Sequence, residues 1–282
     1  MARRLYPLRF MKIATPFVSL LAALLLTATA TTAQRRTVNS MRMLPQLQAE
    51  YALHGDDYLL LNLRGPIGTA GAGLEQLGLL LGYERFWNTQ WSGGATLGID
   101  TYRVNLDGGD LNGLYADLTP ELFARHWNTF GGFNFRQRLG VTYVVPGARG
   151  TDNRALSSLR LDLDRLVPVG EKVVLRPRLA YEGTAWLRFQ RDEATQAKER
   201  VIDFGYARAE VGVRLSNRFD FTPWFGYQTT YLFALPQTDY LGQITIPGGR
   251  LNLVTPVVGL DARFTLFRGG SMFERRQLPA QH

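Results

Sequence analysis

Charged side chains at every second position are the residues in this sequence whose type and spacing could do chemistry. Arg160, Asp162 and Asp164 follow this spacing in one segment, and Arg176 and Arg178 follow it in the next. A guanidinium can hold a carboxylate through two parallel N–H···O bonds, so these groups could pair with one another or bind a polar solute. The residues with this spacing are Glu121, Arg125, Arg136, Arg138, Arg160, Asp162, Asp164, Arg176, Arg178, Glu182, Arg208, Glu210, Arg214, Asp261 and Arg263.

This charged set is compatible with two functions. If the side chains share one enclosed face, each buried charge needs a partner, and opposite charges would form a salt-bridged plug. If the face lines a water-filled passage, the set would favour anions because it holds nine arginines and six carboxylates. The two hypotheses are a largely plugged barrel with a structural or surface-interaction role, and a narrow passive channel for small polar or anionic solutes.

Hydrolytic and metal chemistry have less support in the sequence. The three histidines are His54, His126 and His282, and none has a serine two residues away. A hydrolase at the outer rim of a barrel would need an Asp–His or Ser–His pair. The absence of cysteine excludes disulfides, iron–sulfur clusters and thiolate metal sites. We predict no catalytic residue, no metal site and no cofactor, and an outer-rim hydrolase is the third hypothesis.

The N-terminal segment accounts for part of the formal net charge of +8. Arg3, Arg4, Arg9 and Lys12 precede an apolar stretch at 18–26, and small residues follow it. This order is typical of a cleavable secretory signal peptide, which we assign to residues 1–33. The remaining basic residues are mostly isolated arginines on strand-like segments, so we expect no nucleic-acid partner.

The elements that must position the charges are β-strands. Side chains alternate across a strand, and here the opposite parity is apolar: Leu175, Leu179 and Tyr181 alternate with Arg176 and Arg178. Nine segments show this pattern clearly, at 75–87, 91–104, 118–126, 133–145, 155–167, 173–189, 201–215, 219–234 and 250–267. We therefore predict an all-β, up-and-down antiparallel barrel that spans a membrane with apolar residues facing lipid.

The number of strands follows from the connections. Short turns near 88–90, 127–131, 168–172 and 216–218 alternate with longer connections, as in outer-membrane barrels. Bacterial single-chain barrels have even strand numbers, so 46–64 is predicted as a tenth strand although 54–57 interrupts it; eight or twelve strands are the alternatives. A soluble up-and-down barrel remains open at this point, and it would place the apolar parity inside.

Aromatic residues gather at both ends of the predicted strands. Trp87, Trp91, Trp127 and Trp224 lie near short turns, and others such as Tyr143 lie near the longer connections. Two belts of this kind are typical of the interfaces of a membrane barrel. The predicted organisation is a signal peptide at 1–33, a barrel at 34–267 with a flexible lead-in at 34–45, and a polar periplasmic tail at 268–282.

Together with the closing run from Pro256 to Phe267, these features make the chain similar to the small outer-membrane β-barrels of Gram-negative bacteria, a group that includes uncharacterised families. The resemblance implies a location in the cell outer membrane and contact with outer-membrane lipid. In such proteins the last strand usually ends in an aromatic residue that the barrel-insertion machinery recognises. Phe267 fits that role, although 15 residues follow it here.

Overall fold

The computed structural model describes residues 35–53, 57–68, 73–74, 76–104, 113–147, 152–170, 173–187, 201–216, 218–234, 236–238, 241, 243–246 and 248–267. The predicted signal peptide at 1–33 and tail at 268–282 lie outside these residues. Apart from Arg35, the described residues belong to one compact unit, Arg36–His282. In this part of the chain no helix has the length and apolar character needed to cross a membrane.

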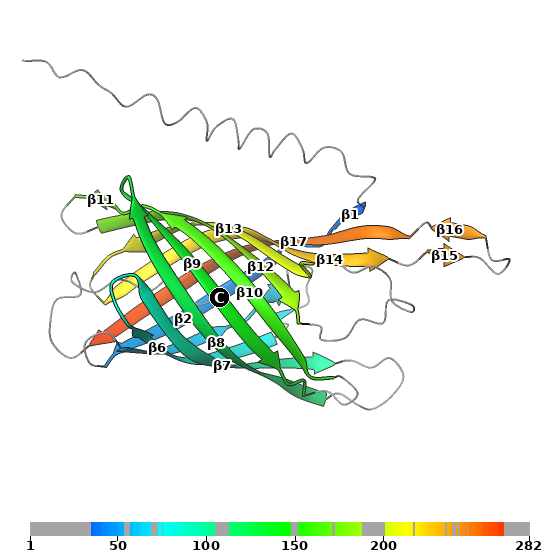
Figure 1. Ribbon diagram of the computed structural model, residues 1–282, viewed down its shortest axis with the longest axis horizontal. Helices are drawn as coiled ribbons and strands as arrows, with labels where there is room; N and C mark the ends of the chain where they lie inside the picture. The colour runs from blue at the N-terminus through cyan, green and yellow to red at the C-terminus, as the bar shows by residue number, and fades with distance from the viewer. Residues whose placement is uncertain are drawn as a thin grey trace, which may run out of the picture. The chain divides into compact units, whose positions relative to one another are not determined.

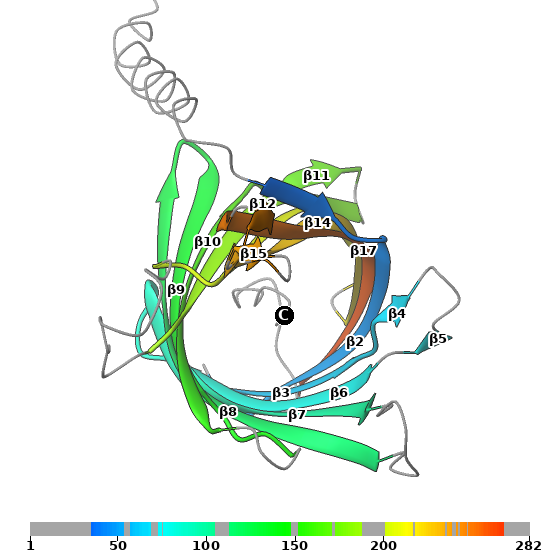
Figure 2. The same ribbon diagram turned by 90° about the vertical axis from the view of Figure 1, so that its right-hand side faces the viewer.

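Eleven strands close into a barrel, which confirms the predicted all-β fold (Figures 1 and 2). Each strand pairs antiparallel with the next strand of the barrel, and the last strand pairs in parallel with the first. The strands are β2 (Arg42–Ala52), β3 (Asp57–Arg64), β6 (Gln76–Phe86), β7 (Trp91–Val104), β8 (Gly113–Phe130), β9 (Phe133–Val144), β10 (Arg154–Asp164), β12 (Val173–Trp186), β13 (Phe204–Arg214), β14 (Phe219–Ala234) and β17 (Gly249–Phe267).

Shorter strands accompany the barrel. β1 (Arg35–Val38) pairs with β17, and β11 (Val167–Val169) pairs with β12. β4 (Ile67–Gly68) and β5 (Gly73–Leu74) lie outside the ring beside β2 (Figure 2). β15 (Gln237–Thr238) and β16 (Ile244–Ile246) pair with each other in the connection between β14 and β17, beyond the ends of those strands (Figure 1).

The barrel has one strand more than the ten predicted because residues 46–64 form two strands. β2 and β3 pair antiparallel, with Ala52 opposite Tyr58 and Gln46 opposite Arg64. The interruption at 54–57 is therefore the site of a reversal, and not an irregularity within one strand. With an odd number, the first and last strands run in the same direction, and the even-number rule does not apply.

Two predicted segment boundaries also differ in the structure. Residues 34–45, predicted as a lead-in, contain β1 and the first residues of β2. The turn predicted at 127–131 is shorter, because β8 continues to Phe130 and pairs with Phe133. Gly131 and Gly132 form this two-residue turn with φ values of 56° and 80°, which glycine adopts without strain.

The connections divide the barrel into two ends. We call one the short-turn end, where the chain reverses between β6 and β7, β8 and β9, β10 and β12, and β13 and β14. Asn88 stabilises the first of these reversals, because its Oδ1 accepts hydrogen bonds from the amides of Gln90 (2.8 Å) and Trp91 (2.9 Å). The opposite end, which carries the longer connections, is the long-connection end.

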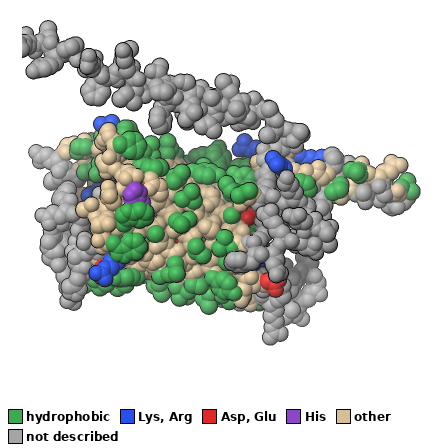
Figure 3. Space-filling view, in the orientation of Figure 1, with side chains coloured by type: hydrophobic (Ala, Val, Ile, Leu, Met, Phe, Trp, Pro, Cys, Tyr) green, Lys and Arg blue, Asp and Glu red, His purple; other side chains and the backbone are tan. Residues whose placement is uncertain are grey.

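The outer wall of the barrel is apolar and its inner wall is polar. Leu159, Leu161 and Leu163 point outward, whereas Arg160 and Asp162 between them are 5% and 2% exposed. Figure 3 shows hydrophobic side chains spread over the visible wall, with charged side chains mainly toward its ends. The expectation of the soluble-barrel alternative, that the apolar parity lies inside, is therefore wrong for these strands.

Not all aromatic residues near the strand ends belong to an outer belt. Trp87 and Trp91 face outward, but Trp127 and Trp224 are each only 5% exposed and lie inside the barrel. The difference follows from side-chain parity: Trp127 shares the inward parity of Arg125 on β8, because side chains alternate along a strand. Proximity to a turn was the wrong criterion for these two residues.

Candidate functional site in the barrel lumen

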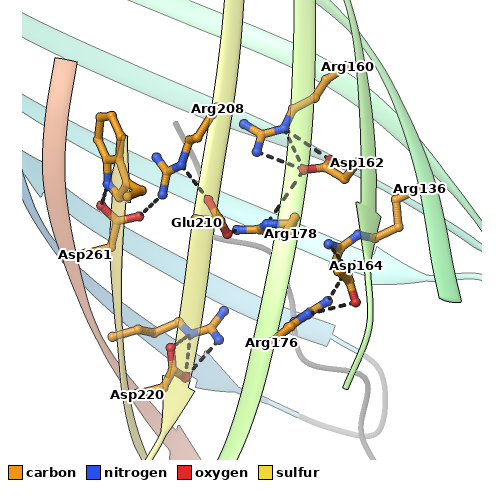
Figure 4. Close-up of polar contacts among 12 residues, drawn as sticks. Arg136, Arg160, Asp162, Asp164, Arg176, Arg178, Arg208, Glu210, Asp220 and Asp261 are labelled. Carbon is orange, nitrogen blue, oxygen red and sulfur yellow. Dashed lines mark hydrogen bonds and ion pairs between the residues drawn. The ribbon is translucent and has the colours of Figure 1, made fainter. Parts of the chain in front are cut away.

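A chain of ion pairs begins on β10 and β12 inside the barrel (Figure 4). Arg160 contacts Asp162 on its own strand, with Nη2 2.9 Å from Oδ1. Its Nη1 lies 3.9 Å from Glu182 Oε2, and Glu182 is the residue directly opposite on β12. Arg178 Nε lies 3.9 Å from Asp162 Oδ1, which extends the chain from β10 back to β12.

The chain continues across β13 to β17. Arg178 pairs with Glu210, the residue opposite it on β13. Glu210 also accepts a hydrogen bond of 2.5 Å from Arg208, and Arg208 donates one of 2.5 Å to Asp261 on β17. The indole N–H of Trp224 donates to Asp261 at 2.7 Å, and its ring lies 4.0 Å below the Arg208 guanidinium. These contacts connect Glu182 to Asp261 through alternating charges.

Asp164 forms a second cluster beside this chain. Its carboxylate is held by Arg136 on β9 and by Arg176 on β12, whose Nε lies 3.1 Å from Oδ1. Asn134 also donates to it at 2.9 Å. Arg136 is almost fully buried, with side-chain Nε and Nη1 atoms that have no hydrogen-bond partner in the structure. An anion held by two cations therefore fills this part of the lumen.

A third cluster connects the last and first strands. Arg263 on β17 donates from Nη2 to Asp220 on β14 at 2.8 Å and from Nη1 to Glu50 on β2 at 3.2 Å. Gln48 donates a further hydrogen bond of 2.8 Å to Glu50. Arg263 is therefore bonded on both sides of its own strand.

The opposite wall carries smaller ion pairs. Arg125 on β8 reaches Glu84 on β6 at 2.6 Å, and Ser92 on the intervening β7 donates to the same carboxylate. The short side chain of Ser92 leaves room for this contact across a strand. The other pairs are Arg138–Glu121 at 2.8 Å and Arg64–Asp100 at 2.8 Å.

The structure brings together nearly the whole set of charges singled out from the sequence. Fourteen of the fifteen residues take part in the ion pairs above, and Arg214 lines a cavity near Arg263 and Asp220. Five further residues of these ion pairs lie outside the set predicted from the sequence: Glu50, Glu84, Asp100, Asp220 and Arg64. With these five, the set holds ten arginines and ten carboxylates, so the arginine excess of the original fifteen disappears when their partners are included.

Two cavities in the described part of the lumen, one toward each end, differ in size. At the short-turn end a cavity of about 20 Å³ lies among Arg176, Arg178, Glu210, Arg214 and Asp220. This is room for about one water molecule. At the long-connection end a cavity of about 310 Å³ lies between β2, β3, β12, β13 and β14, and we call it the vestibule. The vestibule is lined by Leu44, Gln46, Arg64, Glu182, Thr184, Phe204, Gly205, Tyr206, Gln228, Thr229 and Thr230.

An apolar cluster occupies another part of the interior. Ala52, Tyr58 and Leu60 are buried together, and Phe86 packs against them. Phe86 also stacks on Trp127, with ring centroids 5.1 Å apart. This cluster has no clear signal in the sequence, because Tyr58 and Leu60 share their strand with outward leucines and β3 lacks a clear polar parity.

The histidines and acidic residues show no metal site in the described ranges. His126 lies on β8, where Nδ1 is 2.7 Å from Gln137 Oε1 and its ring is 4.4 Å from that of Trp91. His54 and His282 lie outside the described residues. Within those residues no three His, Cys, Asp or Glu side chains are grouped so that they could hold a metal ion.

Comparison with known proteins identified no protein similar to this chain. No family model matches the chain, and neither a curated protein nor a solved structure matches it.

Proposed function

We propose that this protein is a β-barrel of the outer membrane of a Gram-negative bacterium, with a largely closed lumen and a structural or surface-interaction role. Closure of the sheet pairs the backbone groups of its edge strands, which is the condition for strands to lie in hydrocarbon. The apolar outer wall supports the same location, because outward leucines would contact lipid rather than water. The closing strand ends at Phe267, the residue we propose as the signal for the insertion machinery.

The observation that supports a closed lumen most directly is the ion-pair chain from Glu182 to Asp261. Arg178 and Glu210 of this chain line the cavity at the short-turn end, which has a volume of about 20 Å³. Each guanidinium is matched by at least one carboxylate, so the charges do not need a water-filled passage to remain ionised. The balance of ten arginines and ten carboxylates also removes the reason to expect an anion channel.

Planar bilayer recordings test this proposal. The full-length mature protein, inserted from detergent, should give no steady conductance in 1 M KCl. Insertion is checked independently by flotation of the protein with liposomes and by its resistance to carbonate extraction. A stable, ohmic conductance would overturn the closed lumen in favour of the passive channel. A protein that fails to float with liposomes would overturn the membrane location.

A further inference from the structure

The vestibule has hydrogen-bonding groups arranged in a row across three neighbouring strands. Glu182 on β12 lies opposite Tyr206 on β13, and Tyr206 lies opposite Gln228 on β14. All three line the same cavity of about 310 Å³. The next row toward the long-connection end adds the hydroxyls of Thr184 and Thr230 beside the ring of Phe204. One wall of the vestibule is therefore polar, and the rings of Tyr206 and Phe204 lie in it.

Two groups in this wall have unused hydrogen-bonding capacity. The hydroxyl oxygen of Tyr206 is buried and makes no hydrogen bond of ordinary geometry; the Arg208 guanidinium interacts with this oxygen, which leaves the O–H hydrogen for a ligand. A buried O–H donor without an acceptor costs free energy, so its position is more favourable when a ligand or water fills the cavity. The Glu182 carboxylate is 3.9 Å from Arg160 Nη1, which is too long for a hydrogen bond. Its oxygens can still accept hydrogen bonds from a ligand.

The charges of the vestibule indicate that its ligand is neutral. Arg64 is neutralised by Asp100, with Nη2 2.8 Å from Oδ2, and Glu182 is balanced by Arg160. A charged ligand would enter without a free counter-charge and would lose hydration energy. A neutral ligand would instead have to satisfy an acceptor-only carboxylate, hydroxyls and amides, and it would need groups that both donate and accept. Hydroxyl groups have this property.

We propose that the vestibule is a binding site for a small, neutral, polyhydroxylated molecule of the monosaccharide class. The cavity is at the lower end of the size range of ligand pockets, which fits one sugar ring better than a long oligosaccharide. The hydroxyls of the ring bind Glu182, Tyr206 and Gln228, and its C–H face packs on Phe204. This site does not require the membrane location, and it shares only Glu182, the terminal member of the ion-pair chain, with the contacts that close the lumen.

The test is calorimetric titration of the full-length mature protein in a detergent without a sugar headgroup. Neutral hexoses and pentoses form the panel, and a hexose phosphate and a free amino acid are the charged comparisons. We expect saturable binding of at least one neutral sugar and weaker binding of both charged compounds. A wild-type protein that binds no neutral sugar, or that prefers the phosphate or the amino acid, would overturn the proposal.

Two variants locate the site. Tyr206→Phe removes only the hydroxyl, and Glu182→Gln removes the acceptor-only carboxylate; each should weaken sugar binding about tenfold or more. Tyr227→Phe is the matched control, because Tyr227 is on the adjacent strand and points outward, and it should bind as the wild type does. Heat-modifiable migration on gels shows whether each variant is folded. Folded Tyr206→Phe and Glu182→Gln proteins with unchanged affinity would exclude the vestibule as the site.

Discussion

Arg263 Nη1 lies 3.2 Å from Glu50 Oε1, and this contact joins the last strand of the barrel to the first across 213 positions of sequence. The two strands are the parallel pair of the described barrel, β17 and β2. Parallel ladders have slanted hydrogen bonds and are slightly less stable per residue than antiparallel ladders. The ion pair therefore reinforces the pairing that closes the sheet.

Removing this guanidinium should destabilise the barrel. In Arg263→Ala the buried carboxylates of Glu50 and Asp220 lose their common partner, which should cost about 3–5 kcal/mol of the free energy of unfolding. Urea unfolding in detergent, followed by tryptophan fluorescence, measures the change. Arg85→Ala is the control, because Arg85 is 64% exposed and 3.6 Å from Asp57; it should cost less than about 1 kcal/mol. If Arg263→Ala and Arg85→Ala lowered the free energy of unfolding equally, the Arg263 ion pairs would not reinforce the pairing of β17 with β2.

The outer wall should tolerate charge poorly if it contacts lipid. Val211→Arg places a cation on the apolar face of β13 and should destabilise the protein by about 2–4 kcal/mol in a bilayer. Leu241→Arg, at an exposed position in the connection between β14 and β17, should change stability by no more than about 0.5 kcal/mol. Reversible unfolding from liposomes measures both. A neutral effect of Val211→Arg would argue against lipid contact at this position.

Cysteine labelling distinguishes the outer wall from the inner wall and does not introduce a charge that would destabilise the barrel. Val211→Cys should react with a lipid-soluble maleimide in liposomes, and Gly212→Cys, which points toward Arg176 and Thr222, should not. The chain has no native cysteine, so the signal is unambiguous. Labelling of Gly212→Cys in preference to Val211→Cys would invert the polarity of the barrel.

The central ion-pair chain can be opened while the net charge stays constant. Arg178→Ala combined with Glu210→Ala removes a contacting pair and leaves Asp162 with Arg160, and Arg208 with Asp261. This double variant should show a steady conductance in planar bilayers that the wild type lacks. Arg64→Ala with Asp100→Ala is the control, because Arg64 lines the vestibule and not the narrow end; it should stay closed. Conductance in the control but not in the Arg178/Glu210 variant would place the constriction elsewhere.

The assignment of residues 1–33 as a signal peptide predicts a mature protein that begins at Gln34. N-terminal sequencing by mass spectrometry of the membrane fraction tests this. Recovery of a membrane-embedded chain that still begins at Met1 would show that the segment is retained.

Alternation was sufficient to predict the two walls wherever one parity was charged. Arg178 and Leu179 on β12 have opposite environments, 5% and 63% exposed, as their residue types indicate. Alternation was insufficient for β3, where the hydrophobic residues Tyr58 and Leu60 face inward and Leu59 faces outward. Periodicity identifies a face only when the two parities differ in polarity. For the same reason the reversal between β2 and β3 was read as an interruption.

Ion-pair partners were harder to predict than the faces on which they lie. Arg125 and Glu84 are 41 residues apart and on strands that are not neighbours, and their contact depends on the small Ser92 between them. The register of a closed barrel is needed to recognise such a contact, because arginine can reach past an adjacent strand. The vestibule could not be predicted from charge patterning, because Gln228 and Tyr206 carry no charge.

Because β17 and β2 pair in parallel, the chain enters the barrel at one end and leaves it at the opposite end. β2 begins at the long-connection end, whereas β17 finishes at the short-turn end. In a bilayer, an epitope placed just before β1 and another placed just after Phe267 would therefore face different compartments, and a protease added to one side would remove only one of them. The two flanks of this barrel would then report on opposite surfaces of the same membrane, which a barrel with an even number of strands does not allow.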